Sequence, residues 1–209
     1  MYNRRNAMSH FTEILSVLKD VALLAAAIVA SITAILGWHA WRRDLVVKDA
    51  REVARTLLRA TFDLRDAIAA CRTNTYSSQE FPGGLEPDAN KMSLDEKKKA
   101  WQHFFQNRWL PVANFRQEFC HAAREAEILW GRESLDKTDR LLGLVQELDC
   151  AISYHLQCKE YDQSVRPDSP YRSTIYSSGG DADEFAQNVA AAVADIDAYA
   201  RPRLVAAQP

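Results

Sequence analysis

The stretch VALLAAAIVASITAILGWHAW occupies residues 21–41 and contains no Asp, Glu, Lys or Arg, although charged residues stand immediately on both sides of it. As an α-helix it would be roughly 30 Å long, which matches the hydrocarbon core of a bilayer. The run therefore predicts a transmembrane helix. The rest of the chain has no comparable run. Residues 1–20 are then an extramembrane segment, and residues 42–209 are a domain on one membrane face.

Two other interpretations of this run are weaker. A cleaved signal peptide has an apolar stretch of roughly 7 to 15 residues, shorter than this one, although small residues such as Ala30 and Ala34 could still form a cleavage site. The pair Arg42-Arg43 follows the run as a stop-transfer signal would. A buried helix of a soluble protein is disfavoured because the run is apolar on every face.

The charges that flank the run predict its orientation. Lys and Arg are more frequent on its C-terminal side than on its N-terminal side, and such an excess marks the cytoplasmic flank. We therefore predict a single-pass membrane protein, with its N-terminus outside and residues 42–209 in the cytoplasm. Aromatic and basic residues at the end of the run are expected at the membrane interface: Trp38, Trp41, Arg42 and Arg43.

The charge composition and the cysteines limit the classes of function that the chain could have. The chain has 26 Lys and Arg against 28 Asp and Glu, with a formal net charge of −2, so nothing indicates a nucleic-acid binder. Its four cysteines lack the spacing of a disulfide framework, which is consistent with a reducing compartment.

Apolar residues recur every three or four positions through most of residues 50–202, a spacing typical of amphipathic helices. Helices are expected from about 50 to an end near 72–76, and over about 93–130, 134–161 and 181–201. Polar, Pro- and Gly-containing stretches predict loops near 74–92 and 163–180. The predicted fold is all-α: one N-terminal transmembrane helix that continues into an antiparallel bundle of about four helices.

Local signals place the ends of these helices. Ser93-Leu94-Asp95-Glu96 fits a capping box, and Gly131 suits a helix end. Asp181 and Glu184 suggest a second capping pair, whereas Pro202 is expected to end the last helix. Pro111 is expected to kink or split the helix over 93–130, because proline removes a backbone donor.

The second long helix must return toward the membrane if the first descends from it. This arrangement would bring the segment 125–132, and Trp130 within it, close to the bilayer surface. Trp130 is therefore either a membrane-interface residue or a core residue, and the sequence alone leaves both open.

One set of residues has a spacing that is also found in metal sites. Glu118, His121 and Glu125 lie at positions i, i+3 and i+7, and Glu-x-x-His occurs in di-iron bundles. Such a site needs a second Glu-x-x-His and further carboxylates, and the sequence has no second copy. Surface residues of an amphipathic helix are the simpler interpretation, and no cofactor is predicted.

Self-association is suggested by a stripe of small residues in the transmembrane run. Ala22, Ala26, Ala30 and Ala34 recur every four positions, which would let two membrane helices approach closely. The near-heptad spacing of the following helix is compatible with a coiled coil. An alanine-rich membrane helix without a partner is the alternative.

The segments LLRATFDLRDAI at residues 57–68 and EAEILWG at residues 125–131 follow a single predicted membrane helix. In this order they resemble small uncharacterised bacterial single-pass inner-membrane proteins with a helical cytoplasmic domain. The resemblance implies a bacterial inner-membrane location and no activity.

Two classes of function remain. The first is a membrane-anchored interaction or scaffold protein, in contact with the lipid bilayer, self-associating or bound to an unidentified protein partner. The second is a bundle-type metal-dependent protein or enzyme that uses Glu118, His121 and Glu125. No nucleophile elbow, phosphate loop or zinc-protease motif occurs, so an enzyme is the less favoured class.

Overall fold

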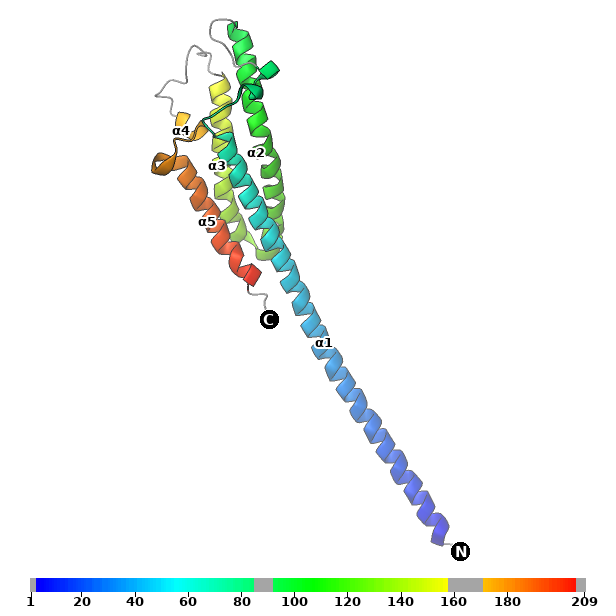
Figure 1. Ribbon diagram of the computed structural model, residues 1–209. Helices are drawn as coiled ribbons and strands as arrows, with labels where there is room; N and C mark the ends of the chain where they lie inside the picture. The colour runs from blue at the N-terminus through cyan, green and yellow to red at the C-terminus, as the bar shows by residue number, and fades with distance from the viewer. Residues whose placement is uncertain (1–2, 85–91, 158–170, 206–209) are drawn as a thin grey trace. The chain divides into compact units, whose positions relative to one another are not determined.

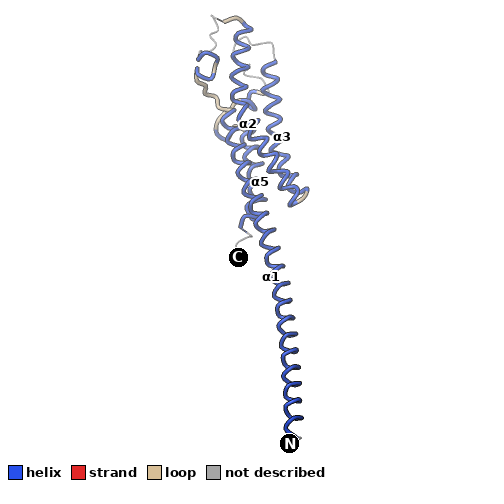
Figure 2. Tube along the Cα trace, turned by 90° about the vertical axis from the view of Figure 1, so that its right-hand side faces the viewer, coloured by secondary structure: helices blue, strands red, loops and turns tan. Residues whose placement is uncertain are grey.

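The computed structural model describes residues 3–84, 92–157 and 171–205. Within these ranges, the side chains of residues 3–18, 20–22, 25, 27, 28, 39, 40, 43, 44, 181 and 205 are outside the description. The described residues form α-helices and short 3-10 helices with no strand (Figure 2). In chain order these are α1 (Asn3–Cys71), η1 (Ser78–Glu80), η2 (Pro82–Gly84), α2 (Leu94–Trp130), α3 (Arg132–Gln157), α4 (Arg172–Ile175), η3 (Gly180–Ala182) and α5 (Glu184–Val205).

The chain divides into two compact units, Met1–Asp49 and Ala50–Pro209. The first unit contains the N-terminal part of α1. The second contains the remainder of α1 and all the other elements. The boundary falls eight positions after the start of the domain predicted over residues 42–209.

The second unit is a bundle of four long helices, formed by residues 50–71 of α1 together with α2, α3 and α5 (Figure 1). Each helix contributes apolar residues at helical spacing to one common core, because an amphipathic helix is stable only when its apolar stripe is covered. The largest fully buried side chains are Phe104, Phe105, Phe119, Leu57, Leu64, Ile68, Leu141, Leu148, Ile196, Val112, Val145 and Thr61. The predicted all-α helical bundle is confirmed.

Two of the predicted helix ends are confirmed in atomic detail. At the start of α2, the Ser93 hydroxyl accepts a hydrogen bond from the Glu96 amide, and the Glu96 carboxylate accepts one from the Ser93 amide at 2.8 Å. At its end, Gly131 has φ 79°, and its amide donates to the Glu127 carbonyl at 2.8 Å. Both signals are local in sequence, so they act in the same way in any tertiary context.

Neither Pro111 nor Pro202 ends a helix. Pro111 does not divide α2, which is helical from Leu94 to Trp130. Proline has no amide hydrogen, so the carbonyl of Asn107, one turn earlier, has no helical donor at position 111. Pro111 and Asn107 are both exposed. Pro202 lies inside α5, which runs four residues further than predicted.

The start of α5 also differs from the prediction. Its first turn is capped by Asp183, whose Oδ1 accepts a hydrogen bond from the Ala186 amide at 2.9 Å. The predicted pair was Asp181 and Glu184; Glu184 is the first residue of the helix, and the Asp181 side chain lies outside the described residues. The cap is therefore the aspartate nearer to the helix, which is the one that can reach the free amide.

No helix in the part of the chain that the structure describes meets the length and apolarity criteria for a membrane span.

Candidate functional site

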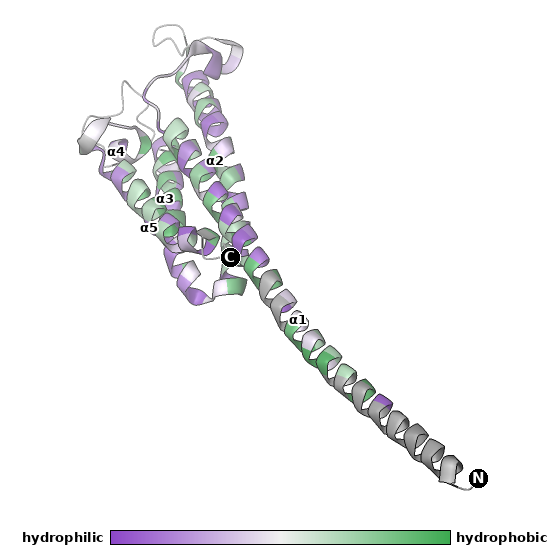
Figure 3. Ribbon diagram, turned by 60° about the horizontal axis from the view of Figure 1, so that its bottom comes forward, coloured by the Kyte–Doolittle hydropathy of each residue, from purple (hydrophilic) through white to green (hydrophobic). Residues whose placement is uncertain are grey.

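The first candidate surface is the N-terminal part of α1. Every described side chain from Leu23 to Asp49 is exposed. The large apolar residues among them are Leu23, Leu24, Val29, Ile32, Ile35, Leu36, Trp38, Trp41, Leu45, Val46 and Val47. Figure 3 shows several hydrophobic segments in green along this part of α1. At 100° per residue these side chains point to all sides of the helix, so this is not the one-sided stripe of a bundle helix.

The residues predicted at the membrane interface can be placed only in part. Trp38 and Trp41 are both exposed, and their ring centroids are 5.2 Å apart. Arg42 is exposed, and the Arg43 side chain lies outside the described residues. Of the alanine stripe, Ala26, Ala30 and Ala34 are exposed, whereas the side chain of Ala22 is also outside the description.

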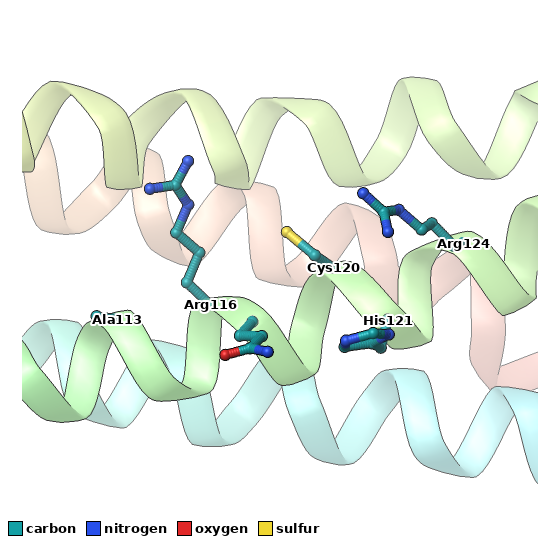
Figure 4. A pocket seen from close by; sticks show the side chains of 6 residues that line it. Ala113, Arg116, Cys120, His121 and Arg124 are labelled. Atoms are coloured by element: carbon teal, nitrogen blue, oxygen red, sulfur yellow. The ribbon is translucent and has the colours of Figure 1, made fainter.

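The second candidate surface is an open groove of about 380 Å³ on the outer side of α2, lined by Ala113, Arg116, Gln117, Cys120, His121 and Arg124. Arg116 and Arg124 extend from the same side of the helix with Cys120 between them (Figure 4). Among the described residues, neither guanidinium has an ion-pair or hydrogen-bond partner, and no carboxylate lines the groove. Two unpaired guanidiniums four residues on either side of Cys120 favour an anionic ligand.

The residues proposed as metal ligands all lie on α2. Glu118, His121 and Glu125 are exposed, and His121 also belongs to the groove. No group of three or more His, Cys, Asp or Glu side chains within the described ranges is arranged to hold a metal ion. The i, i+3, i+7 spacing therefore brings together residues of one helix only, whereas a bundle metal centre draws ligands from several helices.

Trp130 is half-buried at the end of α2. Its ring centroid is 5.8 Å from that of Tyr199, and the Arg203 guanidinium lies 4.9 Å from its centroid. These contacts connect the end of α2 to the last turns of α5, with the cation–π geometry expected for Arg over Trp. Beside Trp130, Ile128 and Leu129 are exposed.

The third feature is a buried arginine that no pattern in the sequence predicts. Arg72 follows α1 directly, and its side chain is 3% exposed. Its Nε donates to the Thr174 carbonyl at 2.7 Å, and its Nη2 donates to the Ser173 carbonyl at 2.6 Å and to Asp183 Oδ1 at 2.8 Å. The guanidinium also stacks over Phe185, 4.5 Å from the ring centroid. Arg72 thus joins the end of α1, α4 and the start of α5.

The carboxyl of Asp183 is stabilised in its charged form. Burial raises its pKa, but the hydrogen bonds from Arg72 and from the Ala186 amide outweigh burial and hold the pKa below its ordinary value. The same oxygen, Oδ1, serves Arg72 and the helix cap. The ion pair therefore also determines where α5 begins.

A second arginine holds the segment that follows α1. Arg108 of α2 donates hydrogen bonds to the carbonyls of Thr73 and Thr75, and its Nη2 lies 2.9 Å from Glu80 Oε2. Its guanidinium lies 4.3 Å from the ring centroid of Phe104. The polar stretch predicted as a loop over 74–92 is therefore anchored to α2 over its described part.

Aromatic side chains form a cluster that includes Phe104, the ring beneath this arginine. Successive ring centroids lie 5 to 6 Å apart in edge-to-face or stacked geometry. The members are Tyr76, Phe81, Trp101, Phe104 and Phe105, with Tyr176 and His155 against Phe105. Burial lowers the pKa of His155 and raises that of Tyr176 to about 12, so both groups are neutral at physiological pH.

The cysteines differ in accessibility. Cys71 is buried, Cys120 is half-buried and Cys150 is exposed, whereas Cys158 lies outside the described residues. Burial raises the pKa of the Cys71 thiol to about 11, despite the opposing charges of Arg108 and Arg72. Cys71 therefore behaves as a small apolar core residue.

Comparison with known proteins finds no match among family models, curated proteins or solved structures.

Proposed function

We propose that this protein is a membrane-anchored helical interaction protein whose bundle receives an anionic segment of a partner. The observation that carries the proposal is the exposed apolar surface of α1 from Leu23 to Val47. Water does not favour so many large apolar side chains on all sides of one helix, whereas a bilayer does. The uncharged run at residues 21–41, the pair Arg42-Arg43 and the resemblance to bacterial inner-membrane proteins support the same conclusion.

Membrane anchoring is tested by extraction. Membranes from cells that produce the full chain are washed with alkaline carbonate, which removes peripheral proteins but leaves spanning proteins in place. We expect the wild type to stay with the lipid and an Ile32→Asp, Leu36→Asp double variant to be released, because each charge at a helix centre opposes insertion by about 3 kcal/mol. A Leu110→Asp variant, which changes an exposed apolar residue of α2, serves as the control and should stay bound. Release of the wild type would contradict the proposal.

Orientation is tested with a thiol reagent that does not cross membranes. A cytoplasmic bundle predicts that Cys150, which is exposed, reacts only after the cells are opened. A cysteine introduced at Ser9 should react in intact cells, since the N-terminus is proposed to lie outside. The reverse pattern would invert the orientation while leaving the anchor intact.

The groove on α2 supplies the proposed binding surface. It carries two guanidiniums without a described partner and no carboxylate, so an acidic segment of a partner protein is its best electrostatic complement. A photo-activated cross-linker at Gln117 should capture a partner in native membranes. An Arg116→Glu, Arg124→Glu double variant should lose this adduct.

The matched control for this capture is an Arg55→Glu, Arg59→Glu double variant. Both residues are exposed on α1 and outside the groove, and the change in net charge is the same. Retention of the adduct in the control and its loss in the groove variant would support the proposed site. Equal loss in both would assign the effect to overall charge instead.

Self-association of the anchor is a further part of the proposal. The stripe of Ala26, Ala30 and Ala34 is exposed in its described part and would permit close helix packing. Cross-linking in membranes should give a dimer that is lost in an Ala26→Leu, Ala30→Leu variant. A Leu24→Ala variant, changed outside the stripe, should still dimerise.

A further inference from the structure

The corner between α2 and α3 exposes two adjacent large apolar residues. Ile128 is 86% exposed, the largest exposed fraction among the exposed large hydrophobic side chains of the described residues, and its neighbour Leu129 is 38% exposed. The corner itself is sharp, because Gly131 has φ 79° and α3 begins at the next residue. Isolated apolar residues are common on protein surfaces, so exposure alone does not indicate a binding surface. The position of this pair in the bundle is the informative observation.

Trp130 is not the residue that projects from this corner. Its ring packs against Tyr199 and under the guanidinium of Arg203. Ile128 and Leu129 have no comparable cover, since both are exposed. The side chains available to an outside surface are therefore the two that precede the tryptophan.

The corner lies at the same end of the bundle as Ala50, the first residue of the second unit. Hydrogen bonds from Arg108 to the carbonyls of Thr73 and Thr75 place Arg108 beside the end of α1. From Arg108 to Trp130, and from Arg72 back to Ala50, the chain covers 22 positions in each case. Both helical stretches extend roughly 33 Å from that common level, so the corner ends level with Ala50.

Only a short stretch of chain links this end of the bundle to the proposed anchor. Ala50 follows Trp41 by nine positions. Nine residues span at most about 30 Å even when fully extended. The end of the bundle that carries Ile128 is therefore the end that the chain joins directly to the segment proposed to enter the bilayer.

From this position we infer that Ile128 and Leu129 form a second membrane contact, in which both side chains enter the boundary between head groups and acyl chains. This inference rests on the proposed membrane anchor. Arg124 and Arg132 are balanced near the corner by Glu125 and Glu127. The contact therefore depends on burial of apolar surface and not on anionic lipid.

The test uses the full chain in phosphatidylcholine vesicles that contain a lipid spin-labelled at the top of its acyl chain or, for a label at position 32 in the middle of the proposed span, near the end of its acyl chain. Cys120, Cys150 and Cys158 are replaced by Ser, and the buried Cys71 is kept. A fluorescent thiol label is then placed on Ile128→Cys, on Leu110→Cys or on Ile32→Cys, one per protein. Leu110 is 60% exposed on the same helix, 18 positions away, and is the matched control; Ile32 reports on the anchor itself.

We expect quenching of the label at position 128 to be roughly twofold or more greater than at position 110, as for a side chain at the interface. Adding phosphatidylglycerol should not change this ratio. Equal quenching at 128 and 110, with strong quenching at 32, would overturn the corner contact and leave the anchor in place. No quenching at 32 would overturn the anchor, and the corner contact with it.

Another occupant of the corner would give a different signal. If a second copy or another protein covered Ile128, the emission of its label would shift to the blue without quenching by the lipid. That outcome would also overturn the membrane contact. Helical content measured by circular dichroism checks that each labelled variant is folded before these comparisons are made.

Discussion

Arg72 Nη2 lies 2.8 Å from Asp183 Oδ1, and both side chains are 3% exposed. The two residues are 111 positions apart, and they join the end of α1 to the start of α5. The guanidinium also binds two backbone carbonyls of the α4 region. A buried charge with these partners is costly to leave unpaired, which makes the pair a sensitive probe of the bundle.

Removal of the arginine should destabilise the bundle strongly. Arg72→Ala leaves the Asp183 carboxylate buried without its cation, and we expect a loss of about 3 to 5 kcal/mol in the free energy of unfolding. The control is Arg65→Ala, which breaks the exposed pair with Asp66 and should cost about 1 kcal/mol or less. Chemical denaturation measures both. Similar losses in the two variants would contradict a special role for Arg72.

The same pair should make stability depend on acid. Because the folded pKa of Asp183 lies below its unfolded value, its ion pair stabilises the fold above pH 4 or so. This contribution should disappear as the pH falls through the lower, folded pKa. Asp183→Asn should be less stable than the wild type at neutral pH, and the difference should shrink in acid. A difference that stays constant from neutral pH to well below pH 4 would show that the carboxylate charge is not involved.

Arg108 should hold the segment after α1 in place. In Arg108→Ala the carbonyls of Thr73 and Thr75 lose their donor and Glu80 loses its cation. Hydrogen exchange at the amides of Phe81 and Gly84, which are bonded within this segment, should then become faster. Arg116→Ala, on the same helix but without a described partner, should leave these amides unchanged. Unaltered protection in Arg108→Ala would mean that the aromatic cluster alone orders the segment.

The cysteines should react in order of exposure. The Cys71 thiol is buried and its pKa is about 11, so almost none of it is thiolate at neutral pH. In a Cys158→Ser variant, a disulfide reagent should modify Cys150 rapidly and Cys71 only after denaturation. Rapid loss of the Cys71 thiol in the folded protein would indicate that the C-terminal end of α1 opens.

Much of the fold could be predicted because its signals are local. The 3.6-residue periodicity, the Ser93–Glu96 box and the Gly131 cap act within one or two helical turns, where residue types alone decide the conformation. Predictions based on a single proline were less reliable. Pro111 and Pro202 lie within helices at exposed positions, where the carbonyl that loses its backbone donor is open to solvent.

The candidate site was less predictable. The i, i+3 spacing of Glu118 and His121 suggested a metal site, but a spacing along one helix cannot show whether ligands from other helices come near. The groove between Arg116 and Arg124 could have been suspected from two arginines on one face with no acidic residue between them on that face. The charges of neighbouring helices, which decide whether those arginines are paired, are brought there only by folding.

By itself, the sequence determined the helical class, the positions of most helix ends and an uncharged run long enough for a bilayer, because each depends on residues close together in the chain. Only the tertiary structure decided that Arg72 is buried, that Arg108 holds the segment after α1 and that Ile128 rather than Trp130 is left uncovered. In the sequence Arg72 lies at the edge of a polar stretch, a position that predicts a solvent-exposed side chain. Arg72 can be buried because folding places the negative charge of Asp183, more than a hundred residues away in the chain, beside its guanidinium. No local pattern of residues predicts this contact.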